Sequence, residues 1–407
     1  MRKTATYAAH PHTRKEIEMI RSKVHRFGTI QMLALLGLLA IGLTASTAGP
    51  ALAPNSNTGG MLLAAAQKTG FQALGQMPGA AAGFGTFASG ISGDGSTIVG
   101  YASVCPNGQS KCTSTDKTEA YRWTVAAGYQ VLGDLGSSIG SSASATSSDG
   151  SVVVGEAPVG GNSFGAFRWT AAEGMVALPL PMIFANAVTA DGRMVAGGDH
   201  WWNTSGQTGT FGPFPGQQDQ TAAYGLSADG GVAVGAAING ADAFGPTFNA
   251  FLWTPAGGLQ DIGVPGVGSD ADAVSADASV IVGEHQVSGF WRAFVWTAST
   301  GMQDIGTLGG PESRALAANQ DGSVIVGTSL TSQLSDSNHA FRWTAKTGMQ
   351  DLQTLLKGTK ASQWIVLFTA NGVSADGTVI AGYGLSPKTN QFPFGQWTPF
   401  RAVLRLP

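Results

Sequence analysis

Charged residues are scarce in this chain, and basic ones become especially scarce after the first 53 residues. Lys, Arg, Asp and Glu together make up 12% of the 407 residues. Residues 1–53 hold 7 of the 22 basic and 2 of the 25 acidic residues, which leaves a net charge of −8 on the remainder. Nucleic acids and anionic membrane surfaces are bound through basic patches. We therefore expect no nucleic-acid partner.

Cysteine is nearly missing: Cys105 and Cys112 are the only two, with six residues between them. In an oxidising compartment such a pair forms a disulfide, and closing so short a loop would add about 2 kcal/mol locally. A metal site is the alternative, but it would need a nearby His or a second Cys pair. We predict a Cys105–Cys112 disulfide, no metal and no other cofactor.

Long apolar runs are also missing, apart from residues 32–43. That run follows a basic segment and precedes Ala51-Leu52-Ala53, which has the Ala-x-Ala pattern of a signal-peptidase site. It is short for a membrane span, so an uncleaved anchor helix is the weaker alternative. We predict a signal peptide over residues 1–53, with Met19 as an alternative start, and a flexible segment over residues 54–70. The product would be exported to the periplasm or the medium, with no membrane span in the mature chain.

The sequence is rich in one thing, which is repetition. A phrase close to Ser-x-Asp-Gly, followed by a β-branched run that ends on Gly, occurs seven times, with its Asp at Asp94, Asp149, Asp191, Asp229, Asp277, Asp321 and Asp376. A second phrase, aromatic-Arg-Trp-Thr, follows most copies, as in Phe341-Arg342-Trp343-Thr344, and a degenerate copy ends at Trp397-Thr398. Periods of roughly 40 to 50 residues with short strand signals are typical of propellers and solenoids.

The unit from Ser313 to Leu352 contains four short strand signals. Its Asp321-Gly322 pair predicts a hairpin with a type I′ turn, which has positive φ at both central residues. Four antiparallel strands per unit describe a propeller blade. The sequence therefore predicts an all-β fold, a seven-bladed β-propeller of four-stranded antiparallel blades over residues 71–407, and we expect a monomer.

Small residues identify the innermost strand of each blade. Ala stands six residues before every repeat Asp, and Ala or Gly stands four residues before it. Residues two apart share one face of a strand, so these positions fit the crowded strand beside the axis. The residues between them would line or approach a wet central channel: Ser89, Ser144, Asn186, Tyr224, Asp272, Leu316 and Asn371. The repeated Phe, Tyr and Trp of the third strand would fill the wedges between blades.

The first repeat is preceded by half of a repeat. Residues 71–75, Phe-Gln-Ala-Leu-Gly, match the fourth-strand phrase of residues 302–306, and the last unit lacks that strand. We expect residues 71–75 to complete the last blade, because this closure removes two exposed sheet edges. The C-terminal tail is the alternative source of the missing strand.

The residues His339-Ala340-Phe341-Arg342-Trp343-Thr344 and Gly348-Met349-Gln350-Asp351-Leu352 resemble the bacterial extracellular repeats of the HAF (His-Ala-Phe) family. The resemblance covers nearly all of residues 71–400. It implies an exported bacterial protein but no particular activity. The Ser-x-Asp-Gly hairpins are also similar to those of WD and Tol-associated propeller repeats. The third unit and Ala278, which stands where the turn Gly is expected, depart from the pattern.

The connections between the second and third strands vary most in length, and function on a rigid scaffold is expected on such loops. They would carry the candidate ligand-binding residues His200, Trp201, Trp202, His285, Trp291 and Arg292. Trp201, Trp202 and Trp291 break the repeat pattern, so we expect them outside the core. A ring around the channel mouth would consist of Tyr101, Glu156, Gly198, Ala236, Glu284, Thr328 and Tyr383.

Two functions remain open. The favoured one is a non-catalytic binding scaffold that takes a glycan or a protein partner on the variable loop face. The alternative is a carbohydrate-active or metal-assisted enzyme using Glu284, His285 or Glu156. Glu156 and Glu284 lie on nearly opposite blades, whereas glycosidase carboxylates lie about 5–10 Å apart.

Overall fold

The computed structural model describes residues 69–105, 117–136, 140–159, 164–217, 221–242, 245–332, 338–390, 392–393 and 395–405. The predicted signal peptide and Cys112 fall outside these residues, so the leader and the Cys105–Cys112 disulfide stay predictions. No helix among the described residues has the length and apolar character needed to cross a membrane.

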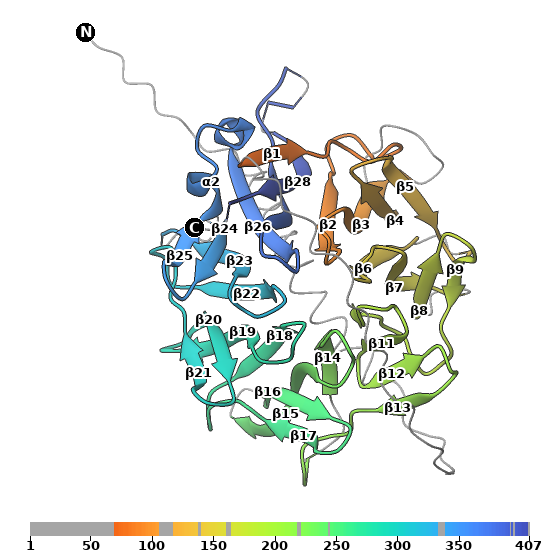
Figure 1. The fold of residues 1–407 in the computed structure, drawn as a ribbon, viewed down its shortest axis with the longest axis vertical. Helices are drawn as coiled ribbons and strands as arrows, with labels where there is room; N and C mark the ends of the chain where they lie inside the picture. Colours follow the sequence, from red (N-terminus) through yellow and green to blue (C-terminus); the bar gives the residue numbers. More distant parts are fainter. Residues whose placement is uncertain are drawn as a thin grey trace, which may run out of the picture. The chain divides into compact units, whose positions relative to one another are not determined.

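Seven four-stranded antiparallel sheets are arranged around a common centre, which confirms the predicted seven-bladed propeller (Figure 1). In each of the first six blades the strands follow one another in chain order from the inside to the outside. Blade 1 consists of β2 (Thr86–Ile91), β3 (Thr97–Val104), β4 (Lys117–Thr124) and β5 (Gly128–Gly133). Blade 2 consists of β6 (Ser142–Thr146), β7 (Val152–Pro158), β8 (Phe164–Thr170) and β9 (Gly174–Ala177). Blade 3 consists of β10 (Ala187–Val188), β11 (Met194–Gly197), β12 (His200–Asn203) and β13 (Thr208–Thr210).

Blades 4 to 7 repeat the arrangement, with longer strands than those of blade 3. Blade 4 consists of β14 (Thr221–Leu226), β15 (Ala233–Asp242), β16 (Gly245–Thr254) and β17 (Gly258–Asp261), and blade 5 of β18 (Ser269–Val274), β19 (Ile281–Val287), β20 (Phe290–Thr297) and β21 (Gly301–Asp304). Blade 6 consists of β22 (Ser313–Ala318), β23 (Ile325–Leu330), β24 (Asn338–Thr344) and β25 (Gly348–Asp351). Blade 7 consists of β26 (Val366–Val373), β27 (Val379–Leu385), β28 (Trp397–Val403) and β1 (Gly70–Ala73). Two short helices, α2 (Leu352–Leu355) and η2 (Lys360–Gln363), connect blades 6 and 7.

Strand β1 closes the ring, as the half-repeat predicted. It pairs with β28, with Gly70 opposite Val403 and Ala73 opposite Phe400. The Phe71 ring packs edge-on against Trp364, with the ring centroids 5.1 Å apart. The last blade therefore combines both ends of the described chain, and no C-terminal strand takes that place.

The Asp-Gly turns form a second closure on the face of the ring that we call the turn face. In each turn a backbone N–H donates to the carbonyl of the residue just before the Asp of the next blade. The seven bonds are Asp94 to Ser148, Ser148 to Ala190, Ala190 to Ala228, Ala228 to Ala276, Asp277 to Gln320, Gln320 to Ala375 and Ala375 to Gly93, at 2.8–3.2 Å. Because the seventh bond returns to the first blade, the repeats make a closed circle and not an open solenoid.

The Ser-x-Asp-Gly phrase is explained by hydrogen bonds within each turn. In blade 2 the buried Ser147 hydroxyl donates to Asp149 Oδ1 (2.7 Å) and accepts from the Val152 N–H (3.0 Å). The predicted type I′ turn is wrong, because Ala278 and Ser288 are the only described non-glycine residues with positive φ. The Asp has ordinary φ, accepts from the N–H two residues ahead, and leaves positive φ to Gly150 alone (71°). This is a type I turn followed by a left-handed Gly.

A bulge in the inner strand explains the Gly that ends each β-branched run. In blade 6 the register moves from Ala315 opposite Gly327 to Ala317 opposite Val326, so Leu316 is an extra residue. Ala315 and Ala317 therefore lie on opposite faces of the blade, and the expectation that they share one face is wrong. A Cβ on Gly327 would lie 2.0 Å from the Arg314 carbonyl oxygen, so no other residue fits there.

The hydrophobic core consists of wedges between neighbouring blades. The third strands contribute its largest fully buried side chains, Tyr121, Phe167, Phe251, Phe294, Phe341 and Phe400. This confirms the predicted role of the repeated aromatic residue. In the last blade the register places Phe400 opposite Gly382 and Ala402 at the position of the repeated Trp. Trp397 is therefore not a copy of that Trp, and the degenerate copy predicted at Trp397-Thr398 is wrong.

Candidate functional site

The two tryptophans of blade 3 do not lie on a variable loop. Only Gly198 and Asp199 separate β11 from β12, and Val195 pairs with Trp202 as Ile325 pairs with Trp343. Trp202 is therefore this blade's copy of the repeated Trp. Both side chains are half-buried, Trp201 against the cluster that contains Phe211 and Trp202 against the cluster that contains Met182. Their expected placement outside the core is wrong, and their role in ligand binding stays untested.

The candidate residues of blade 5 also lie in strands. A two-residue turn at Ser288-Gly289, with φ of 53° and 85°, joins β19 to β20. It brings His285 opposite Arg292 and places Trp291 opposite Gln286. Trp291 is half-buried, so the structure brings these residues together as a paired strand end and not as an open loop.

His285 and Arg292, at this strand end, differ in their polar contacts. Arg292 Nε lies 3.5 Å from Asp304 Oδ2. Burial lowers the pKa of His285, and no described residue hydrogen-bonds its buried Nε2. The other two described histidines, His200 and His339, each place Nδ1 against a carboxylate, of Asp199 and Asp351 respectively.

No metal centre is assembled from the candidate residues. The three described histidines lie on blades 3, 5 and 6. Within the described parts of the chain, no group of three or more His, Cys, Asp or Glu side chains is placed to hold a metal ion.

A level of polar and aromatic residues surrounds the axis near the opposite face of the ring, which we call the loop face. In six of the blades it pairs the residue seven before the repeat Asp with the residue seven after it, as in Asp270 opposite Glu284 and Phe87 opposite Tyr101. This level lies roughly 20 Å along the strands from the turn face. Six of the seven predicted mouth residues are half-buried there, and Ala236 is buried.

The charged part of this level lies where blades 5 and 6 meet. Arg314 of β22 donates to Asp272 through Nε (2.8 Å) and Nη2 (2.5 Å), and its Nη1 lies 3.6 Å from Glu284 Oε1. The side chains of Asp272 and Glu284 are 8% and 15% exposed, whereas that of Arg314 is 37% exposed. Three carboxylates, including that of Asp270, therefore face one guanidinium that still reaches solvent.

Burial sets the protonation of these carboxylates. It raises the pKa of Glu284 to about 8, since the nearby charges of Asp272 and Asp270 add to the effect that Arg314 opposes. Burial likewise raises the pKa of Asp270 to about 6 and that of Glu156, on blade 2, to about 7. Glu284 is thus mainly protonated at neutral pH and can donate as well as accept a hydrogen bond.

The aromatic part of the level lies where blades 7 and 1 meet. The Phe87 ring stacks on Tyr101 at 5.3 Å and meets Tyr383 edge-on at 5.1 Å. Phe368 packs against Tyr383 and, at 5.2 Å, against Trp397. The Thr328 hydroxyl donates to the Phe368 carbonyl (3.0 Å), which links this group to blade 6. All five rings are half-buried, and they form a continuous aromatic wall.

The loop-face level differs from the site that the sequence indicated. Sequence reasoning named Glu284, Tyr101 and Tyr383 as mouth residues but missed Phe87 and Arg314. The missed residues stand seven positions before a repeat Asp, where the residue type varies from blade to blade. That variation within an otherwise regular repeat was the available signal. Glu156 and Glu284 belong to blades 2 and 5, and in the described structure neither carboxyl is among the groups that shift the pKa of the other.

Comparisons with known proteins find likenesses among solved structures alone. No family model and no curated protein matches the chain. Among solved structures, a putative TolB from Agrobacterium tumefaciens is 11% identical over 84% of this chain and 100% of its own, with a TM-score of 0.42. An oligogalacturonate lyase in complex with manganese is 11% identical over 82% and 93%, with a TM-score of 0.49. The β-propeller domain of the trilobed protease from Pyrococcus furiosus is 9% identical over 78% and 95%, with a TM-score of 0.49. The chain is a seven-bladed β-propeller similar to TolB-like and other propeller proteins, and these likenesses leave its function unresolved.

Proposed function

We propose that the protein is an exported binding scaffold that holds a glycan at the loop face, along the arc from blade 5 to blade 1. The observation that carries the proposal is the juxtaposition, on neighbouring blades, of a hydrogen-bonding group and an aromatic wall. Asp272, Glu284 and Arg314 supply fixed donors and acceptors of the kind that sugar hydroxyls use. Phe87 and Tyr383 supply ring faces for the apolar side of a sugar.

The export of the protein rests on the leader sequence and on the resemblance to HAF repeats, and both belong to the proposal. The acidic balance of the residues after the leader supports a neutral or cationic ligand over a nucleic acid. A rigid closed ring suits this role, because a preorganised site loses little conformational entropy on binding.

A glycan array probed with the purified protein tests the proposal, followed by titration of the best ligand. Asp270→Asn and Tyr383→Ala should each weaken binding at least tenfold, since each changes one half of the loop-face level. Glu173→Gln is the matched control, because Glu173 lies exposed on the turn face and its loss should leave binding unchanged. Equal binding by all three variants, or capture of a protein and no glycan, would contradict the proposal.

A carbohydrate-active enzyme is the second candidate, favoured by one observation. Glu284 has a raised pKa of about 8 and lies beside Asp272, and a carboxyl that is protonated at neutral pH can act as a general acid. The test is whether the protein hydrolyses a ligand found on the array. Loss of that hydrolysis in Glu284→Gln, with binding of the ligand unchanged, would favour the enzyme over the binding scaffold.

A further inference from the structure

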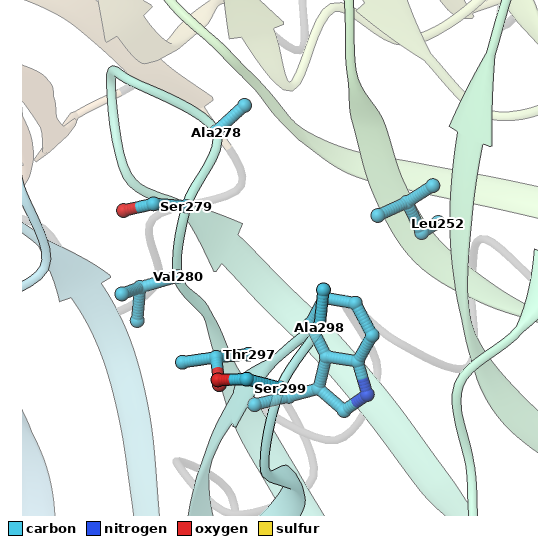
Figure 2. Close-up of a pocket in the computed structure, with 8 residues that line it drawn as sticks. Leu252, Ala278, Ser279, Val280, Thr297, Ala298 and Ser299 are labelled. Atoms are coloured by element: carbon cyan, nitrogen blue, oxygen red, sulfur yellow. The ribbon is translucent and has the colours of Figure 1, made fainter.

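A hollow of about 500 Å³ lies between blade 4 and the turns of blade 5, on the turn face (Figure 2). Figure 2 shows Leu252 on one side of it and Ala278, Ser279 and Val280 on the other. Trp296 and the segment 297–299 complete its lining. The hollow lies far from the loop-face level, so it is independent of the function proposed above.

At the equivalent place blades 1, 2, 6 and 7 carry an arginine, and in blades 1, 2 and 7 this arginine crosses to the next blade. In these three blades the arginine that follows the repeated aromatic residue donates from Nε to the carbonyl of the turn Gly of the following blade. The three bonds are Arg122 to Gly150 at 2.8 Å, Arg168 to Gly192 at 3.4 Å and Arg401 to Gly95 at 3.1 Å. The repeat therefore contains a built guanidinium position on its turn face.

Both partners of this bond are replaced between blades 4 and 5. Leu252 pairs with Val234 as Arg122 pairs with Val99, so Leu252 holds the arginine position. Ala278 replaces the turn Gly and keeps its left-handed backbone, with φ of 63°. No described residue donates a hydrogen bond to the Ala278 carbonyl. The acceptor is kept while the guanidinium is missing, and the hollow is the space that the guanidinium would fill.

We propose that this hollow binds a guanidinium group supplied from outside, the arginine side chain of a partner protein. The Ala278 carbonyl would accept from the guanidinium, as the Gly carbonyls do in three other blades. The half-exposed Trp296 and the residues Ser279, Thr297 and Ser299 line the same space. A planar guanidinium can stack flat on an indole while its N–H groups donate within its plane, whereas a tetrahedral ammonium group cannot stack in this way.

The test uses Nα-acetyl-arginine amide as the probe, with the lysine and citrulline analogues as controls, in calorimetric titrations of the full chain. We expect a Kd of about 1 mM for the arginine probe, the scale of one charged hydrogen bond with a cation–π contact. The lysine and citrulline analogues should bind at least fivefold more weakly. Equal binding of the three compounds, or no binding of any, would overturn the proposal.

Variants at the two replaced positions separate this site from adventitious binding. Leu252→Arg should fill the hollow from within and abolish probe binding, and Leu252→Phe, which fills it without a charge, should do the same if the arginine variant does not fold. Ala278→Gly restores the repeat backbone but leaves the hollow open, so it should bind the probe as the unmodified protein does. Probe binding that survives both Leu252 variants would place the guanidinium elsewhere and refute the assignment.

Discussion

Replacement of Phe71 by alanine should destabilise the whole ring, because Phe71 fixes the strand that closes it. Its ring lies 5.1 Å from that of Trp364 and 5.6 Å from that of Phe400. A fully buried Phe→Ala change costs about 3–5 kcal/mol. Phe71 is only half-buried, so we expect a loss of about 2 kcal/mol in the free energy of unfolding.

The assay is urea unfolding followed by tryptophan fluorescence and by circular dichroism. Gln72→Ala is the matched control: Gln72 is the next residue of the same strand, its side chain is exposed, and its loss should change stability by less than about 0.5 kcal/mol.

A double-mutant cycle tests whether closure through β1 is the cause. Phe71 and Trp364 are far apart in sequence and meet only if β1 completes the last blade. The changes Phe71→Ala and Trp364→Ala should therefore couple by about 1 kcal/mol, the scale of one aromatic pair. Additive effects, or a Phe71 variant as stable as the Gln72 control, would refute closure of the ring by this strand.

Three further predictions concern charge, core and cysteine. Burial holds the pKa of Glu284 at about 8, above its ordinary 4.5. The contribution of Glu284 to stability is therefore fully present below about pH 4.5 and is lost as the pH rises towards 8. The melting temperature of Glu284→Gln should match that of the unmodified protein at pH 4 and exceed it at pH 8. Trp202→Ala should lower the free energy of unfolding by about 2–4 kcal/mol, because the indole fills a wedge between blades. An unchanged melting temperature would mean that Trp202 lies outside the core. Intact-mass analysis after alkylation should find Cys105 and Cys112 unmodified in the exported protein, and two alkylated thiols would contradict the disulfide.

The repeat made the architecture readable from sequence, whereas irregularities within the repeat were harder to interpret. Seven repeat phrases, six with Asp-Gly and one with Asp-Ala, and a displaced half-repeat were enough to predict seven blades and the strand that closes them. Trp201 and Trp202 were placed on a loop because their blade departs from the repeat. The strand register in the structure corrects this placement, because the two residues that connect β11 to β12 are too few for a loop. Both indoles therefore lie in strand β12 and pack into the wedges between blades.

The candidate site was only partly predictable, for a physical reason. Position relative to the repeat Asp selected Glu284 and Tyr383, because the same strand position recurs in every blade. The contacts that give these residues their chemistry come from neighbouring blades: Arg314 reaches Asp272 across 42 residues, and Tyr383 meets Phe87 across the ring closure. No local pattern encodes such pairs.

By itself, then, the sequence determined the number and type of blades, since local turn chemistry and periodic small and aromatic residues act within one repeat. Only the tertiary structure decided the inner-strand bulge, the ring of turn-to-turn hydrogen bonds, the raised pKa of Glu284 and the hollow beside Leu252. Each of these depends on the distance between residues of different strands or blades. Packing sets those distances, and packing is a property of the closed ring and not of any single repeat.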